Sequence, residues 1–346
     1  MTSSSLVGLL SALLLLLPAT CGLLRFTAPR TSSVAGQPGA GQLDQAAMDA
    51  WFRELQQTLA EVQMDGDVLV TTVTWAYIDF FENWWCSLKR IQPEPPDVRF
   101  LVFANDLRSR DYLRNHGVAV VLNPALLAAG EHNPGEDGQE MSWASSAYTN
   151  LMGERTKFLL TVLEEGYNVL TFDIDAVWEK NPLGFLDRRY DLVVVQEVPY
   201  SKLTTDGVHG MEVCGCFLYL VNTPTTRALM TETVHFFSKP QFSFNEQKVL
   251  GYLLQYRQGT PWEGVRMKFL PKPEFPNGRE YYGYSHEGAH PYDQATREEV
   301  VVLHNNWVQG HSTKQQRWVE DGHWYVEQAA RHGNAYTCRP VKDTAR

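Results

Sequence analysis

The chain has 346 residues, of which 44% are hydrophobic and 20% are charged, and its formal net charge is −10. This composition is that of a globular protein with enough apolar residues for a large core. An acidic chain without an evident basic patch lacks the cations that neutralise nucleic-acid phosphates, so we expect no nucleic-acid partner.

The amino-terminal segment, residues 1–25, predicts entry into the secretory pathway. Residues 6–17 are almost wholly apolar, and small residues follow them. Counted to Pro18, the run is typical of a cleaved signal peptide; counted to Leu24, it is long enough for a signal anchor in the membrane. Both alternatives place the rest of the chain in the secretory lumen, as a Golgi type II membrane protein or as a secreted protein.

The next segment is small, polar and aperiodic, which is typical of a stem or linker. We assign residues 26–60 to this linker and residues 61–340 to one folded domain.

Four cysteines follow the amino-terminal segment: Cys86, Cys214, Cys216 and Cys338. In an oxidising lumen, an even number predicts two disulfides. A bridge between Cys214 and Cys216 would be strained, so we expect each of them to pair with Cys86 or Cys338. Zinc binding by Cys214 and Cys216 is disfavoured because the sequence offers no second ligand pair nearby.

Apolar segments of strand and helix type alternate along the chain. Strands are predicted at residues 68–74, 98–104, 118–122, 169–172, 192–195 and 217–221, with a last strand at 300–303. Helices are predicted at residues 77–89, 107–115, 154–165, 226–237 and 245–256. An aperiodic stretch at 271–292 predicts a long functional loop. This alternation predicts an α/β fold with a Rossmann-type, mixed but mostly parallel sheet flanked by helices.

Two carboxylates follow the strand predicted at residues 169–172. Asp173 and Asp175 are two positions apart, so in extended backbone they point to the same side, about 6–7 Å apart. Two like charges this close favour a cation between them, and oxygen ligands suit Mn²⁺ or Mg²⁺. Asp65 and Asp67 have the same spacing but precede a strand, so we interpret them as part of a turn.

Four separate blocks carry a family resemblance. They are Lys157 with residues 166–170; Phe172–Trp178 with 181–183; residues 245–247; and residues 302–307 with Gly310 and Lys314. In this order they resemble the nucleotide-diphospho-sugar transferase family of GT-A glycosyltransferases, which includes plant rhamnogalacturonan-II xylosyltransferases and arabinosyltransferases. The match covers about residues 67–320. One position departs from the family, which commonly has Asp-Gln where this chain has Glu246 and Gln247.

The resemblance implies the ligands of a metal and of a sugar donor. Asp173 and Asp175 would bind Mn²⁺ or Mg²⁺, Asp173 would also contact the donor, and His304 would complete the coordination. The remaining donor contacts would come from the base-binding positions Val73 and Thr74, from Lys157 above the phosphates or sugar, and from Asn305, Gly310 and Lys314 at the pyrophosphate.

The implied activity is the transfer of a sugar, with xylose or another pentose favoured, from a UDP-sugar to a glycan hydroxyl. The family implies retention of configuration at the anomeric carbon, with Asp175 acting through the ion and Glu246 or Gln247 near the reacting carbon. A lumenal sugar-nucleotide- or carbohydrate-binding pseudoenzyme and a metal-dependent hydrolase remain as alternatives. The tryptophans Trp84, Trp85, Trp178 and Trp307 are interpreted as core residues rather than sugar platforms.

Overall fold

The computed structural model describes residues 45–92, 97–128, 140–197, 213–239, 245–283, 292–329 and 336–340. Residues 1–25 and the first part of the predicted linker lie outside these ranges. Among the described helices, none combines the length and the apolar character needed to cross a membrane.

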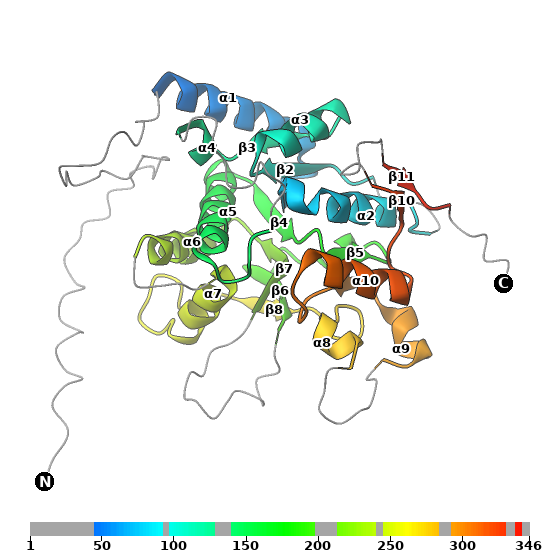
Figure 1. The fold of residues 1–346 in the computed structure, drawn as a ribbon. Helices are drawn as coiled ribbons and strands as arrows, with labels where there is room; N and C mark the ends of the chain where they lie inside the picture. The colour runs from blue at the N-terminus through cyan, green and yellow to red at the C-terminus, as the bar shows by residue number, and fades with distance from the viewer. Residues whose placement is uncertain are drawn as a thin grey trace, which may run out of the picture.

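A seven-stranded sheet in the order β3-β2-β1-β4-β7-β6-β8 forms the centre of the fold (Figure 1). Its strands are β1 Asp67–Val73, β2 Phe100–Ala104, β3 Val120–Leu122, β4 Asn168–Phe172, β6 Leu192–Gln196, β7 Val213–Leu220 and β8 Met267–Phe269. Four of its six pairings are parallel, and β7 runs antiparallel to both β4 and β6. The predicted mixed, mostly parallel sheet is confirmed.

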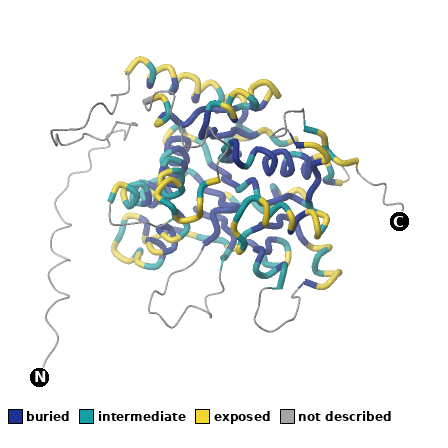
Figure 2. The backbone as a smooth tube through the Cα atoms, in the orientation of Figure 1, coloured by how far each residue is buried: buried dark blue, intermediate teal, exposed yellow. Residues whose placement is uncertain are grey.

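Helices cover both faces of this sheet, which explains why its strands are continuous apolar runs. In β1, Val68 and Val70 belong to one core cluster, whereas Leu69 and Val73 belong to the other. One face is covered by α1 Gln45–Val62, α5 Ser146–Glu164, α6 Pro224–Phe237 and α7 Glu246–Gln255. The other is covered by α2 Ile78–Leu88, α3 Leu107–Asn115 and α10 His311–Asp321. Figure 2 shows the buried backbone concentrated between these layers.

The chain crosses the sheet between β3 and β4, and this crossing creates a switch point. The strands β1, β2 and β3 extend in one direction, and β4 then returns to the free side of β1, with Thr71 opposite Phe172. In open α/β sheets, ligands bind outside the carboxyl ends of strands at such a point. Asp173 follows β4 directly, so the fold places it there.

A short two-stranded ribbon brings further residues to this edge of the sheet, at the carboxyl end of β4. It pairs β5 Ala176–Trp178 antiparallel with β9 Val302–His304, and it sets Ala176 opposite His304. The ribbon therefore brings residues 128 positions apart in the sequence, Ala176 and His304, next to the end of β4.

The linker prediction is wrong for residues 45–60, because α1 occupies Gln45–Val62. Leu55 and Leu59 are fully buried, and the indole Nε1 of Trp51 donates to the Leu122 carbonyl oxygen over 2.7 Å. The apolar face of α1 lies against the sheet, so the folded domain begins before residue 61.

Later elements also differ from the prediction. The strand expected last is followed by β10 Val326–Gln328 and β11 Thr337–Cys338. The expected loop at 271–292 contains α8 Gly278–Tyr281, and residues 284–291 lie outside the described ranges. The short helices α4 Ala125–Ala128 and α9 Gln294–Glu299 complete the described α-helices.

The predicted disulfide pairing is wrong. Cys86 in α2 bonds to Cys338 in β11, and Cys214 bonds to Cys216. The hairpin of β10 and β11 brings Cys338 to α2, which no feature of the sequence indicated. The cysteines Cys214 and Cys216 lie where the pairing of β6 with β7 jumps from Leu218 to Cys214, so this segment is irregular.

Candidate active site

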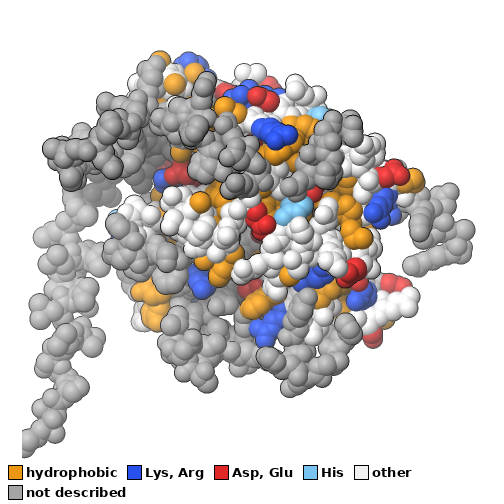
Figure 3. Space-filling view, viewed as in Figure 1, with side chains coloured by type: hydrophobic (Ala, Val, Ile, Leu, Met, Phe, Trp, Pro, Cys, Tyr) orange, Lys and Arg blue, Asp and Glu red, His pale blue; other side chains and the backbone are white. Residues whose placement is uncertain are grey.

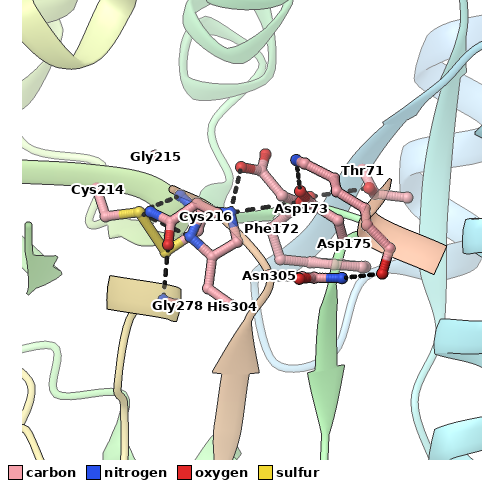
Figure 4. A network of polar contacts seen from close by, with 12 residues as sticks. Thr71, Phe172, Asp173, Asp175, Cys214, Gly215, Cys216, Gly278, His304 and Asn305 are labelled. Carbon is pink, nitrogen blue, oxygen red and sulfur yellow. Dashed lines mark hydrogen bonds and ion pairs between the residues drawn. A yellow bond between two sulfur atoms is a disulfide. The ribbon is translucent and has the colours of Figure 1, made fainter. Parts of the chain in front are cut away.

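The predicted metal ligands converge at the carboxyl end of β4. Nε2 of His304 lies 3.4 Å from Oδ1 of Asp175 and 3.8 Å from Oδ2 of Asp173. One ligand atom from each residue lies within 4.8 Å of the others. Figure 4 shows the aspartates and His304 facing one another from the β4 and β9 segments. Two carboxylates and one imidazole form a ligand set that fits Mn²⁺ or Mg²⁺.

Two cationic side chains neutralise the aspartates. Arg155 on α5 donates from Nη1 to Oδ1 of Asp173 over 2.7 Å, and Lys314 on α10 pairs with Oδ2 of Asp175. Burial raises the pKa of Asp175, but Lys314 and His304 outweigh this effect and hold it well below its usual range. Asp175 is therefore ionised at neutral pH and available as a metal ligand.

His304 is buried, and burial by itself would lower its pKa. The carboxylates of Asp175 and Asp173 outweigh burial, so the pKa of His304 is raised above its ordinary value. Its other ring nitrogen, Nδ1, lies 3.4 Å from Sγ of Cys214. A cation bound among these residues would therefore replace a proton on His304.

A buried carboxylate, Glu246, lies behind the aspartates. Its Oε1 is 3.8 Å from Nη1 of Arg155, and among the described residues its Oε2 has no hydrogen-bond partner. Burial raises the pKa of Glu246, and Arg155 offsets this only in part. The neighbouring Gln247 accepts a hydrogen bond over 2.9 Å from the backbone N–H of Gly215. The structure thus brings both predicted catalytic residues of α7 to the site.

The start of α10 forms the other wall of the site. Gly310 precedes this helix with φ +94°, a left-handed conformation that favours glycine, and Lys314 lies in the first turn. Asn305 is fully buried: its Nδ2 donates to the Lys314 carbonyl over 2.9 Å, and its Oδ1 accepts from Nε of Arg317 over 2.6 Å. The side chain of Asn305 therefore holds α10 in place.

The remaining predicted donor residues lie in two places. Val73 ends β1 and Thr74 follows it, at the same sheet edge as Asp173, because β1 and β4 are parallel. Lys157, in contrast, pairs with Glu154 on its own helix over 2.6 Å, and its side chain is 40% exposed. The described contacts do not connect Lys157 with the aspartates.

Arg155 is the main site residue that the sequence analysis missed. It lies one turn before Phe158 and Leu159 on the buried face of α5, so a charged residue interrupts an apolar stripe. Arg155 is only 5% exposed, and its Nη2 also donates to Thr171 Oγ1 and to the Gly215 carbonyl, each over 3.0 Å. A charged residue within an apolar helix face was the signal that could have revealed it.

Trp307 corrects another expectation. Trp84 and Trp178 are buried as predicted, but Trp307 is 46% exposed and has φ +59°. It follows the segment that carries His304 and Asn305, and the guanidinium of Arg279 lies 5.1 Å from its ring. It is a surface residue beside the site.

Acidic and histidine side chains lie side by side near the centre of the face drawn in Figure 3, where α2, α10 and the end of β4 approach one another in Figure 1. At the start of α10, the ring Nε2 of His311 lies 2.8 Å from Oδ1 of Asp79, and the backbone N–H of His311 donates to Glu140 over 3.0 Å.

Comparison with known proteins identifies the family of this chain. The sequence model of the family described as "Nucleotide-diphospho-sugar transferase" matches residues 97–318. The Arabidopsis thaliana protein named UDP-D-xylose:L-fucose alpha-1,3-D-xylosyltransferase 3 is 26% identical over 319 residues, which are 88% of this chain and 78% of that protein. The UDP-galactose:fucoside alpha-3-galactosyltransferase of Dictyostelium discoideum is 24% identical over 202 residues, covering 54% of this chain and 29% of that protein.

Among solved structures, a complex of the galactosyltransferase LgtC aligns with a TM-score of 0.43 and 14% identity, covering 73% of this chain and 94% of that chain. Mouse xyloside xylosyltransferase 1 aligns with a TM-score of 0.41 and 9% identity, covering 70% and 98%. These structural likenesses are weak, so the family assignment depends on the sequence match over residues 97–318. On that match, the chain belongs to the nucleotide-diphospho-sugar transferase family and is a glycosyltransferase.

Proposed function

We propose that this protein is a metal-dependent, retaining glycosyltransferase that moves a sugar from a UDP-sugar to a hydroxyl group of a glycan acceptor in the secretory lumen. The observation that carries the proposal is the convergence of Asp173, Asp175 and His304 within 4.8 Å at the switch point of the sheet. Their oxygen and nitrogen atoms suit Mn²⁺, with Mg²⁺ as the alternative.

The donor diphosphate would lie between the metal ligands and α10. When bound, the ion would act as a Lewis acid on the phosphate oxygens, with Asp173, Asp175 and His304 as its ligands. Lys314 adds a point charge, and the positive end of the helix dipole of α10, which follows Gly310, favours an anion. Asn305 acts through Lys314 as a positioning residue. The base would lie near Val73 and Thr74, at the same edge of the sheet.

The carboxylate proposed to act near the reacting carbon is that of Glu246. It is buried beside Arg155 and Gly215, and one of its oxygens has no partner among the described residues. Retention follows either from attack on the same face of the sugar or from a covalent intermediate in which Oε of Glu246 replaces the diphosphate at the anomeric carbon. In both routes, the acceptor proton can pass to the departing phosphate. Gln247 accepts a hydrogen bond from Gly215 and orients it, and Gln247 is the alternative to Glu246 as the side chain near the anomeric carbon.

The donor sugar is proposed to be xylose or another pentose. The relatives include proteins named for UDP-D-xylose and for arabinose transfer, although another is named for UDP-galactose. A secretory compartment is supported by the Cys86–Cys338 disulfide, because disulfides persist in oxidising environments. Membrane attachment would depend on residues 1–25, which lie outside the described ranges.

Replacing Asp175 by Asn distinguishes an enzyme from a binding protein. The change keeps the shape but removes one negative charge beside the ion, so turnover should fall about 10²–10³-fold. UDP affinity should fall less, since the contacts near Thr74 and Lys314 remain. The measurement compares released UDP and sugar transfer over a panel of nucleotide sugars with UDP affinity at fixed Mn²⁺.

Three outcomes would change the conclusion. Near-wild-type turnover by the Asp175→Asn variant would refute the metal site. Tight UDP binding without turnover of any donor by the wild type would favour the sugar-nucleotide-binding pseudoenzyme. Equal UDP affinity with and without a chelator would refute the metal dependence.

A further inference from the structure

Two cysteine sulfurs lie beside the metal-ligating histidine. Cys214 and Cys216 are fully buried in β7, and Sγ of Cys214 lies 3.4 Å from Nδ1 of His304. The two sulfurs and a His304 nitrogen lie within 4.8 Å of one another. Figure 4 shows His304 between the disulfide on one side and the aspartates on the other.

We propose that reduction of the Cys214–Cys216 disulfide creates a second metal site, in which the two thiolates and Nδ1 of His304 bind a zinc-class ion. Two cysteines and one histidine with an open fourth position are an established zinc ligand set. Zinc–sulfur bonds of about 2.3 Å and zinc–nitrogen bonds of about 2.0 Å place tetrahedral ligand atoms about 3.5 Å apart. The distance of 3.4 Å between Sγ of Cys214 and Nδ1 of His304 already fits this geometry.

Reduction of the Cys214–Cys216 disulfide requires two electrons, which a dithiol reductant supplies. Two electrons from the reductant cleave the sulfur–sulfur bond of the protein, the reductant becomes a disulfide, and Cys214 and Cys216 become thiols. Binding of one zinc ion then releases both thiol protons to solvent and leaves two thiolate ligands.

The two metal sites would exclude each other because they share His304. A neutral imidazole has one N–H group and one nitrogen lone pair. In the oxidised protein, an N–H at Nδ1 can point to the Cys214 sulfur, so the lone pair of Nε2, which lies 3.4 Å from Asp175, can bind the catalytic ion when that ion replaces the Nε2 proton. When Nδ1 binds zinc, Nε2 carries the proton and is no longer a ligand for the catalytic ion. The disulfide therefore keeps His304 available to the aspartates.

The irregular backbone of β7 supports a functional role for this segment. The pairing with β6 skips residues 215–217, and Gly215 between the cysteines contacts Arg155 through its carbonyl and Gln247 through its N–H. Reduction of the disulfide can therefore alter the contacts that Gly215 makes with Arg155 and Gln247. This competition with the catalytic ion rests on the proposed function, whereas metal binding by the sulfurs does not.

Cobalt absorption provides the test, because Co²⁺ bound by thiolate has a ligand-to-metal charge-transfer band that oxygen and nitrogen ligands do not produce. We expect the band in the reduced full-length chain at one equivalent of Co²⁺, its loss on addition of zinc, and no band in the oxidised chain. The Cys86→Ser/Cys338→Ser variant should keep the band, and the Cys214→Ser/Cys216→Ser variant should lack it. His304→Gln should weaken cobalt affinity at least tenfold.

Absence of the band in reduced wild type, or its persistence without Cys214 and Cys216, would overturn the proposal. So would a disulfide that no dithiol reduces in the folded chain, as judged by thiol titration and circular dichroism. In a second arm, zinc should weaken Mn²⁺-dependent UDP binding at least tenfold in reduced but not in oxidised protein, and unchanged binding would refute the competition. Failure of the oxidised protein to bind UDP would instead refute the proposed function, because the cobalt spectrum does not depend on UDP.

Discussion

Gly215 has no room for a side chain, because a Cβ at this position would lie 2.8 Å from Oε1 of Glu246. The atom in the way is the end of a flexible side chain, so a substitution would displace the carboxylate rather than the backbone. A glycine between two cysteines thus sets the position of the proposed reacting group.

Replacing Gly215 by Ala should lower sugar transfer about 100-fold, since a displacement of about 1 Å in an active site can cost that much. The melting temperature should change little. Gly264→Ala is the control, because a Cβ there meets nothing within 4 Å. Equal transfer rates for the two variants would show that the position of Glu246 does not matter.

Substitutions of Arg155 and Lys157 test which of these two cationic residues of α5 contributes to catalysis. Arg155→Lys keeps the charge but cannot reach Asp173, Thr171 and the Gly215 carbonyl together, as the guanidinium does. One lost hydrogen bond to a charged group costs about 1.5–3 kcal/mol, so we expect donor turnover to fall about 10- to 100-fold.

Lys157→Ala should change turnover by less than about twofold, because the lysine pairs only weakly at the surface with Glu154. Steady-state kinetics on both variants, with thermal unfolding as a check on folding, makes the comparison. A larger loss for Lys157→Ala than for Arg155→Lys would restore the donor role predicted for Lys157.

At the scale of elements, the end of α10 contains a pH-sensitive contact. Gly322 ends the helix in a left-handed conformation, and Nδ1 of His323 then lies 2.9 Å from Oδ2 of Asp321. Burial lowers the pKa of His323, but Asp321 and Glu179 outweigh it, so the pKa is raised above the ordinary value of 6.5. Arg297 also faces this group and partly opposes the increase.

A raised histidine pKa means that the folded state binds the proton more tightly than the unfolded state. The stabilisation is complete below the unfolded pKa and is lost as the pH rises through the folded pKa. The melting temperature should therefore decrease, as the pH rises above 6.5, more in wild type than in His323→Gln. Parallel pH profiles of the two proteins would assign the effect to other groups.

At the scale of the whole molecule, the Cys86–Cys338 disulfide joins positions 252 residues apart. A bridge that closes so long a loop restricts the unfolded chain, and removing such a native disulfide typically costs about 2–5 kcal/mol. The bridge also connects β11, near the carboxyl end of the chain, to α2 in the core.

The free energy of unfolding should therefore decrease by about this amount when the wild type is reduced. The difference between oxidised and reduced protein should vanish in Cys86→Ala/Cys338→Ala and persist in Cys214→Ala/Cys216→Ala, whose bridge spans a separation of only 2. Denaturant titrations under both conditions provide the measurement. If the difference between oxidised and reduced protein persisted in Cys86→Ala/Cys338→Ala, the Cys86–Cys338 disulfide would not be its source.

The sequence by itself determined the alternation of strands and helices, because apolar periodicity and stop residues are local properties. The predicted helix at 107–115 agrees with the observed α3, and the aspartates after β4 lie where the pattern placed them. The family blocks further indicated His304, Lys314 and Glu246, which the structure brings to one site.

Only the tertiary structure decided which distant residues meet. The sheet order, the ribbon of β5 and β9, and the irregular pairing of β7 bring Arg155, Gly215 and the two central cysteines around His304. The disulfide partners and the buried face of α1 likewise depend on contacts across the sheet. These features depend on packing between residues that are far apart in the sequence. A local sequence pattern does not specify which distant segment a helix or strand will pack against.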